Sequence, residues 1–410
     1  MMSDVEESID RINFSLINGR TKILENIRIL LYREVPVFFE LLDYENDKIF
    51  YEPLLFAHFY AKVKSATLEQ LLFGHIENPK RPDAIDALTD EHGWIYLSEI
   101  GWLKTAVLNQ KVKLIKDNET TAGLSVFIEN TKVPYDFEHI LKIDNTSFEI
   151  VAHQHPLLVP HYFDSKQKLV EVEIDDVTKI QKKNLVKAFY LIGQFVPAYY
   201  KLLAAAIQKV VIFNDPTIKR NSFATLSVHG CAFCNSFQSE YDEVFFVEDI
   251  AHQCGHVIFN NIIHGNKDIF RISPETIIKE KGFFGAIVNL LEKRTLFVAF
   301  HALFTYYSIT LCLEACLLKA ELTLLQKHEA LGRLAFCFRK YTNDIELLGK
   351  VDKDGQSLYF TEAGLELYRP MEALYKKTRI EWVVKIKKIN LLNQPYNFSV
   401  KNFRTSNPIK

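Results

Sequence analysis

The segment HQCGH places His252 and His256 four residues apart. On an α-helix such residues lie one above the other on the same face, so two imidazoles can bind one metal ion. The zinc-protease signature His-Glu-x-x-His has the same spacing, but Gln253 stands here where that signature has glutamate. Because glutamine accepts no proton at neutral pH, hydrolysis by a glutamate base is disfavoured. The spacing alone leaves two buried core histidines as the alternative to a metal site.

A third metal ligand is predicted at His301, the only ionisable residue in the first half of the apolar segment 295–318. Burying such a group without a partner is costly, which favours contact with another polar group. At about 100° per residue, one side of the predicted helix carries a polar seam near His301. Its members are Arg294, Thr305, Ser308 and Cys312. We expect the seam to face a buried metal pocket; the alternative is a core histidine bonded to a backbone carbonyl.

Two arginines are candidates for holding a carboxylate ligand next to the metal. Arg294 lies seven residues before His301, about 10 Å along a helix axis. Arg333 falls on the next predicted helix. A guanidinium binds a carboxylate through two parallel hydrogen bonds, which suits either arginine to this role. The alternative for each is an ordinary helix-end or surface arginine. Asp249 lies one turn before His252 and is expected to orient the His252 side chain as a metal ligand.

The six cysteines offer a second, weaker metal-binding pattern. Cys231 and Cys234 are separated by two residues and lie near His229. A structural zinc site needs two further ligands close by, and no second Cys-x-x-Cys follows. We therefore expect free, reduced, buried thiols, which are typical of a cytoplasmic protein.

The composition is that of a soluble globular protein, with 410 residues, 48% hydrophobic and 24% charged. A formal net charge of −2 argues against general nucleic-acid binding. The start MMSDVEESID is acidic and polar, unlike a signal peptide, which also favours a cytoplasmic location. The segment 295–318 is long enough to span a membrane, but it contains His301 and Glu314 and lacks a biased basic flank. We interpret it as a buried helix and expect no membrane association.

The spacing of apolar residues predicts an α+β protein in three parts. Residues 1–170 form a mixed α/β N-terminal region, 171–378 a mainly helical metal-binding domain, and 379–410 a basic C-terminal tail. Within the second part, Pro197 is expected to divide a long helical stretch, and Thr361 to cap the last helix. Three closely spaced histidines of the first part are expected at the surface, in a segment interrupted by prolines. They are His153, His155 and His161.

The order of elements between residues 180 and 375 resembles a known family. The first two elements are the helical stretch AFYLIGQFVPAYYKLLAAAIQKVV and the strand-like FATLSVHG. The motif segment VEDIAHQCGH follows, and then the elements RTLFVAFHALF and FTEAGLELYRPM. This order is similar to that of the α-ketoglutarate-dependent HExxH peptide hydroxylases of ribosomal-peptide modification clusters. The chain departs from the family at Gln253, where glutamate is expected, and at Thr295, where proline is expected.

The resemblance implies a helical, non-cupin domain that holds one Fe(II) ion. His252 and His256 match the motif histidines and His301 the downstream histidine, so these three residues would be the iron ligands, with Gln253 in the place of the motif glutamate. The implied cosubstrates are α-ketoglutarate (2-oxoglutarate) and O2. The candidate cofactor-binding residues are Arg294, Arg333, Thr305 and Ser308. The implied reaction is hydroxylation, at the β-carbon, of a side chain in a ribosomally synthesised precursor peptide, which residues 1–170 would help to recognise.

Two other interpretations remain open. The chain would be an inactive zinc metallopeptidase-like protein if it binds zinc, because the general base is missing. It would be a non-catalytic peptide-binding module if the histidines are structural. The sequence also leaves the oligomeric state open, with a homodimer among the alternatives.

Overall fold

The computed structural model describes residues 2–144, 146–215, 217, 219–266, 268–278 and 294–409, without the side chains of residues 2–8. These residues form both helices and sheets, and the helices predominate. The predicted α+β class with a helical C-terminal part is therefore confirmed.

The chain folds into two compact units that take up alternating segments of the sequence. The helical unit comprises Met1–Arg20, Lys183–Ala206 and Gln238–Lys410. The mixed unit comprises Thr21–Lys182 and Ile207–Phe237. The predicted divisions after residues 170 and 378 do not coincide with these boundaries, two of which fall inside the helices α1 (Met2–Glu34) and α6 (Asp175–Phe195).

Two antiparallel sheets belong to the mixed unit. The first has the strand order β1-β4-β5-β6, with β1 (Ala84–Leu88), β4 (Lys111–Lys116), β5 (Leu124–Ile128) and β6 (Thr131–Val133). The second has the order β2-β3-β7, with β2 (Trp94–Leu97), β3 (Gly101–Thr105) and β7 (Tyr135–His139). Alternate residues of β1 and β4 are buried, as expected for strands with one face on a core.

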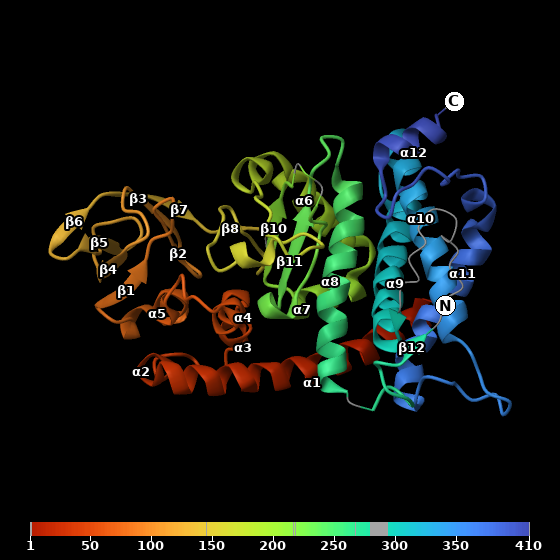
Figure 1. Ribbon diagram of the computed structural model, residues 1–410, viewed down its shortest axis with the longest axis horizontal. Coiled ribbons are helices and arrows are strands. Elements are labelled where there is room, and N and C mark those ends of the chain that lie inside the picture. The colour runs from red at the N-terminus through yellow and green to blue at the C-terminus, as the bar shows by residue number, and fades with distance from the viewer. Residues whose placement is uncertain are drawn as a thin grey trace. The chain divides into compact units, whose positions relative to one another are not determined.

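A third sheet joins segments that are far apart in the sequence (Figure 1). It contains β8 (Leu141–Lys142), β9 (Glu149–Ile150), β10 (Lys209–Phe213) and β11 (Cys231–Asn235). β9, β10 and β11 run parallel, and β10 and β11 are buried along their whole length. The continuous apolar runs VVIF and CAFC suit strands covered on both faces. This sheet places residues 207–237 with the N-terminal sequence.

Short helices complete the mixed unit. They are α2 (Pro36–Phe39), α3 (Asp47–Phe50), α4 (Pro53–Tyr60), α5 (Leu68–Leu72) and the 3₁₀ turns η1 (Phe73–His75), η2 (Asn78–Lys80), η3 (Val159–His161) and η4 (Leu226–Val228). On α5, the buried Gln70 accepts from Leu88 N at 3.1 Å and donates to Tyr96 O at 3.0 Å. One side chain therefore satisfies backbone groups of β1 and β2, which are the edge strands of two different sheets.

The histidines expected at the surface are buried. His153, His155 and His161 have exposed fractions of 5%, 1% and 6%. His153 lies between Asp175, at 2.7 Å, and Glu138, at 2.9 Å. Burial alone would lower the pKa of His153, but these two carboxylates raise it. The surface prediction was wrong because the partners of the histidines come from distant parts of the sequence.

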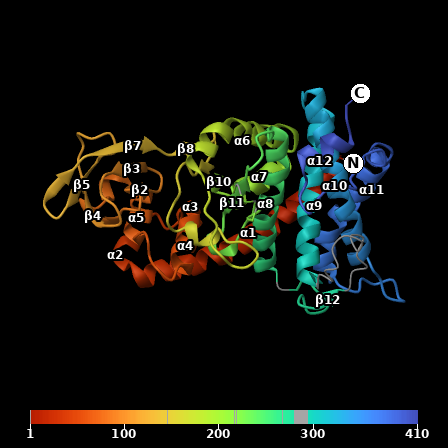
Figure 2. The same cartoon turned by 45° about the horizontal axis from the view of Figure 1, so that its top comes forward.

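Four long helices form most of the helical unit. They are α8 (Glu243–Gly265), α9 (Leu296–Lys319), α10 (Leu324–Leu348) and α11 (Glu362–Ile386). α9, α10 and α11 lie side by side in Figures 1 and 2, and α8 packs against α9. α9 is long and apolar enough to cross a membrane, but most of it is buried inside this unit. It is therefore placed as the core helix of a soluble protein would be.

Smaller elements pack around these helices. They are α7 (Pro197–Ala206), α12 (Val400–Ser406) and the strand pair β12 (Ile277–Ile278) and β13 (Arg294–Thr295). Part of the predicted basic tail is helical, because α11 continues to Ile386 and α12 follows it. On α12, the buried Phe403 faces Gly332 of α10, where a Cβ would lie 2.4 Å from its ring.

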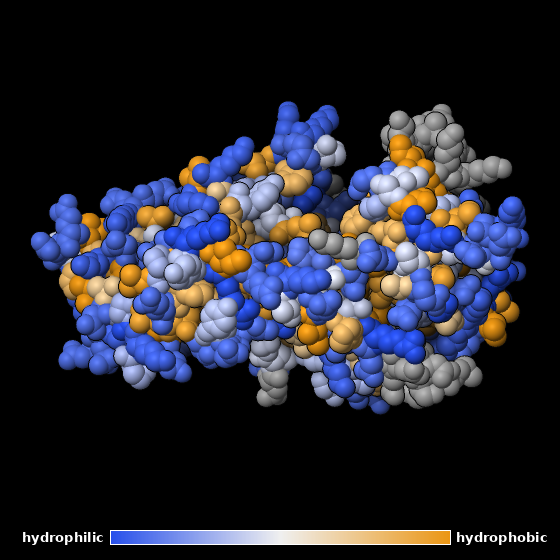
Figure 3. Space-filling model, turned by 90° about the horizontal axis from the view of Figure 1, so that it is seen from below, coloured by the Kyte–Doolittle hydropathy of each residue, from blue (hydrophilic) through white to orange (hydrophobic). Residues whose placement is uncertain are grey.

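The start of α1 also belongs to the helical unit, where it crosses α8. A Cβ on Gly19 would lie 1.7 Å from the carbonyl oxygen of Asn261, and one on Gly265 would lie 2.6 Å from Gly19 N. The two backbones therefore touch, which only glycine permits at these positions. On the face shown in Figure 3, hydrophilic side chains are widespread and hydrophobic ones are dispersed among them.

Candidate metal centre

The helix α8 holds the first two predicted ligands. It begins after Asp242, whose carboxylate accepts from Val244 N at 2.9 Å and so caps the helix. The rings of His252 and His256 lie one turn apart, with centroids separated by 4.9 Å. This is the arrangement that their spacing predicts.

The helix α9 brings the third predicted ligand to the same place. Thr295 caps α9 by accepting from Val298 N, so that His301 lies in the second turn. His256 Nδ1 and His301 Nε2 are 2.8 Å apart, with the ring planes nearly perpendicular at 89°. The structure thus gathers His252, His256 and His301 into one histidine cluster.

Close contact between α8 and α9 depends on Gly255. A Cβ at Gly255 would lie 3.3 Å from Ser308 Oγ and 3.5 Å from Thr305 Cα, so there is little room for a larger residue. The hydroxyls of Thr305 and Ser308 donate to the backbone of their own helix, at Ala302 O and Phe304 O. This part of the predicted polar seam therefore faces α8, where it supports the crossing of the two helices. A direct role of the two hydroxyls in cofactor binding stays a prediction.

The histidine cluster is neutral at pH 7. Burial lowers the pKa of His256 to about 4. Burial, together with the neighbouring His256, lowers the pKa values of His252 and His301 well below the ordinary value. His301 also stacks on the ring of Phe259, with centroids 4.7 Å apart. Neutral imidazole is the form that binds a metal ion.

Gln253 is paired with the carboxylate of Asp249. Its Nε2 donates to Asp249 Oδ1 at 3.1 Å, and the side chain is buried. Its Oε1 is buried and has no hydrogen-bond partner among the described residues. Gln253 therefore donates a hydrogen bond to a buried acid, and its carbonyl oxygen remains an unused acceptor.

Arg294 is not part of α9, contrary to the sequence prediction. The helix begins at Leu296, and Arg294 lies in β13, opposite Ile278 of β12. Its guanidinium makes two hydrogen bonds to Asp344 on α10, of 2.8 and 3.0 Å. The cap at Thr295 is the physical reason, because it starts the helix at Leu296, two residues after Arg294.

Arg333 also binds carboxylates of the protein itself. It is buried, and it donates to Glu329 at 2.9 Å and to Glu248 at 2.6 Å. Burial alone would lower the pKa of Arg333, but Glu248 and Glu329 raise it. Its third nitrogen, NH2, is buried and makes no hydrogen bond within the part of the chain that the structure describes. Both predicted carboxylate-binding arginines are therefore already engaged by acidic side chains.

The sequence analysis did not single out Lys340 on α10. Burial lowers its pKa, and its charge contributes to lowering the pKa of His252. Lys340 Nζ donates to the backbone carbonyl of Tyr396 at 3.0 Å. Nothing in the sequence around Lys340 distinguishes it from the other charged residues of its helix. Its influence on His252 follows only from the packing of α8 against α10.

Glu314 and the cysteines are engaged elsewhere. Glu314 accepts hydrogen bonds from Lys377, Thr378 and Trp382 of α11. All six cysteines are free and buried, as expected. Cys231 and Cys234 lie in β11 of the mixed unit, whereas the histidine cluster belongs to the helical unit.

The donor types of the histidine cluster fit a divalent iron or zinc ion. Metal–nitrogen bonds of about 2.1 Å put neighbouring nitrogens of a six-coordinate ion about 3 Å apart, near the separation of His256 Nδ1 and His301 Nε2. These two atoms face each other as a hydrogen-bonded pair. Across the described ranges, no group of three His, Cys, Asp or Glu side chains stands in metal-holding geometry. A metal ion would displace the hydrogen that the pair shares.

Comparison with models of known protein families gives no match, and comparison with curated proteins gives none either. Assignment of a function therefore depends on the histidine cluster and its surroundings.

Proposed function

We propose that the helical unit binds one Fe(II) ion and that the protein is a 2-oxoglutarate-dependent hydroxylase of peptide side chains. The observation that carries the proposal is the gathering of three partly buried, neutral imidazoles from α8 and α9, where Gln253 stands in place of a glutamate base. Iron bound there would supply the activation of O2 that C–H hydroxylation needs.

The residues of the chain have separable roles in this proposal. His252, His256 and His301 would hold the iron, and their partial burial lowers their pKa values and so keeps them neutral. Gln253 cannot take a proton from a bound water, which disfavours peptide hydrolysis. Gly255 lets the two ligand-bearing helices approach.

The described contacts do not fit direct binding of 2-oxoglutarate by either predicted arginine. Arg294 would have to exchange Asp344, and Arg333 would have to exchange Glu248, for the distal carboxylate of that cosubstrate. We therefore derive no step through 2-oxoglutarate. Its place in the proposal rests on the resemblance of residues 180–375 to the HExxH peptide hydroxylases, as does the precursor-peptide substrate.

The proposal also covers the cellular compartment of the reaction and the roles of the two units. Six free, buried thiols are compatible with the reducing cytoplasm, where ribosomally made peptides are modified. The mixed unit would bind part of the precursor peptide, while the helical unit would carry out the chemistry.

The test is metal binding followed by visible spectroscopy. Protein purified without oxygen is expected to take up about one Fe(II) per chain and, after addition of 2-oxoglutarate, to show a weak charge-transfer band. His301→Ala should lose both the iron and the band because it removes one of three ligands. The matched control is His139→Ala, which changes an exposed histidine on β7 of the mixed unit. Circular dichroism verifies that both variants are folded.

Other outcomes would select a different function. Retention of zinc without the charge-transfer band would contradict the hydroxylase proposal. It would favour a zinc-binding, peptidase-like protein, because three imidazoles also suit zinc. Failure to bind any divalent ion would leave a non-catalytic peptide-binding module. Fe(II)-dependent formation of succinate with a peptide present would support hydroxylation directly.

A further inference from the structure

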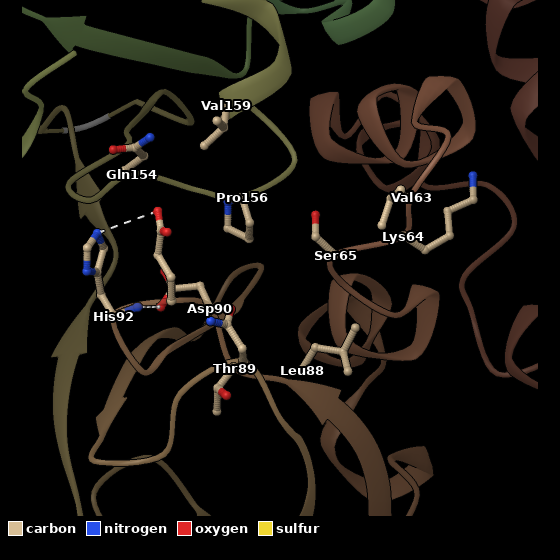
Figure 4. A pocket seen from close by; sticks show the side chains of 12 residues that line it. Val63, Lys64, Ser65, Leu88, Thr89, Asp90, His92, Gln154, Pro156 and Val159 are labelled. Atoms are coloured by element: carbon tan, nitrogen blue, oxygen red, sulfur yellow. Dashed lines mark hydrogen bonds and ion pairs between the residues drawn. The ribbon is translucent and has the colours of Figure 1, made fainter. Parts of the chain in front are cut away.

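The mixed unit contains a cavity of about 470 Å³ that the proposed metal chemistry does not use. Ligand pockets have volumes of roughly 300–1,000 Å³, so this one can hold a small molecule or a side chain of a larger ligand. Three segments form most of its wall, namely 63–65, 88–92 and 154–159 (Figure 4). Asn109 completes the lining.

Part of the wall is apolar. Val63, Leu88, Pro156 and Val159 contribute aliphatic surface to the cavity (Figure 4). Val63 is also among the exposed large hydrophobic residues. Such walls suit an aliphatic stem, which gains by leaving water while its polar end stays hydrogen-bonded.

A rigid carboxylate stands at one end of the cavity. Asp90 is 7% exposed, and its Oδ1 accepts from His92 N and Trp94 N, both at 2.8 Å. Its backbone is fixed as well, with its N–H donating to Trp94 O and its carbonyl accepting from Asn109 N. Its second carboxylate oxygen makes no hydrogen bond within the described part of the chain. A nearly buried acid thus offers the cavity one unused acceptor.

A second carboxylate lies beside it. Glu91 also lines the cavity with a largely exposed side chain, and its Oε1 is 3.8 Å from His92 Nε2. Lys64 lines the opposite side, but its ammonium donates to His58 O and points away from the cavity. Lys104 donates to the carbonyl of His92 and does not line the cavity. The polar end of the cavity therefore presents two carboxylates to a ligand, and no lysine or arginine of the described ranges pairs with either of them.

We propose that this cavity binds a guanidinium or ammonium group carried on an aliphatic stem. Asp90 and Glu91 would take the charge in charge-assisted hydrogen bonds, and the apolar wall would take the stem. Two sources share this chemistry, an arginine or lysine side chain of a peptide and a free aliphatic amine. The site lies wholly in the mixed unit and needs no metal, so it goes beyond the proposed hydroxylation and is independent of it.

The test is calorimetric titration of the full-length, metal-free protein with three probes. They are acetyl-Ala-Arg-Ala-amide, the same peptide with neutral citrulline in place of arginine, and agmatine. The arginine peptide is expected to bind at least about ten-fold more tightly than the citrulline peptide, because only arginine carries the charge. Agmatine separates the two sources. Tighter binding of agmatine assigns the site to a free amine, and tighter binding of the arginine peptide assigns it to a peptide.

Matched variants locate the binding. Glu91→Gln should weaken the cationic probe that binds more tightly about five- to ten-fold, and Asp90→Asn should weaken it at least as much while keeping the Oδ1 acceptor of the turn. Glu119→Gln, which removes an exposed carboxylate outside the cavity, should change nothing.

Equal binding of the arginine and citrulline peptides would overturn the proposal, and so would unchanged binding in both cavity variants. Glu91→Gln keeps the test decisive even if Asp90→Asn fails to fold, because the side chain of Glu91 supports no turn. Failure here leaves the histidine cluster untouched, and failure to bind iron leaves this cavity untouched.

Discussion

Gln253 is held in place by a hydrogen bond to its neighbour Asp249. An amide can donate a hydrogen bond to the buried carboxylate one turn earlier, whereas an ionised glutamate cannot. The four-residue spacing was enough to predict that His252 and His256 share a face. It did not reveal the Gln253–Asp249 contact, because spacing alone does not determine side-chain rotamers.

Gln253→Glu is therefore expected to destabilise the protein, although it creates the His-Glu-x-x-His signature. It places two buried carboxylates where the amide and Asp249 now meet at 3.1 Å. The expected loss of unfolding free energy is about 2–4 kcal/mol at pH 7. Urea unfolding followed by circular dichroism measures it. The double variant Gln253→Glu/Asp249→Asn should recover most of the loss, and a fully stable single variant would contradict this account.

His155 should make the mixed unit sensitive to acid. Burial, aided by Lys209, lowers its pKa to about 3, whereas an unfolded histidine titrates near 6.5. Between these values the unfolded chain binds more protons, so the unfolding free energy falls as the pH falls. His155→Gln should remove about 1–2 kcal/mol of the loss between pH 7 and pH 5, as measured by urea unfolding at both pH values. His139→Gln, at an exposed position, is the control, and equal pH slopes in all three proteins would refute the assignment.

Local signals predicted several helix ends correctly. Thr361 caps α11 by accepting from Gly364 N, and Pro197 starts α7 directly after α6, as expected. Periodicity failed at Lys209–Phe213, which reads as the end of a helix but forms β10. Its β-branched residues find parallel partners in β9 and β11, so tertiary pairing decides the structure there.

The crossing of α1 and α8 has no periodic signal either, since it depends on the single glycines Gly19 and Gly265. Gly19→Ala is expected to lower the unfolding free energy by at least about 2 kcal/mol, because the added methyl meets backbone that cannot move aside. Urea unfolding and limited proteolysis of the N-terminus measure the effect.

Gly193→Ala is the matched control for this crossing. It adds the same methyl inside α6, where the nearest atom is the Tyr200 ring at 3.4 Å. Its effect should stay within about 1 kcal/mol, because alanine also favours the helix. Equal losses of unfolding free energy in the two variants would show that the contact between Gly19 and Gly265 does not contribute specifically to stability.

The molecule as a whole consists of two units that the chain enters and leaves repeatedly, with boundaries at residues 20, 182, 206 and 237. Sequence periodicity describes neighbours along the chain and therefore favours contiguous domains. The mixed character of the N-terminal part and the helical character of the later part were predictable. The return of residues 207–237 to the mixed unit was not, because it depends on long-range strand pairing.

A fragment of residues 1–170 is therefore expected not to fold. It lacks β10 and β11, and it leaves the buried Glu52 and Glu149 without Lys209, which contacts both. The fragment 21–237, which holds the whole mixed unit, should unfold cooperatively. Circular dichroism during heating distinguishes the two fragments, and a cooperative transition in the shorter one would disprove this division.

The contact between the start of α1 and the end of α8 also sets an order of events at the ribosome. Asn18 donates to the carbonyl of Gly265, a partner 247 residues further along the chain. The mixed unit has all of its residues once position 237 has been synthesised, whereas the first helical turns to emerge must wait for α8. The part of α1 before Thr21 therefore stays without its partner helix until position 265 has been synthesised, although the rest of α1 can already pack in the core of the mixed unit.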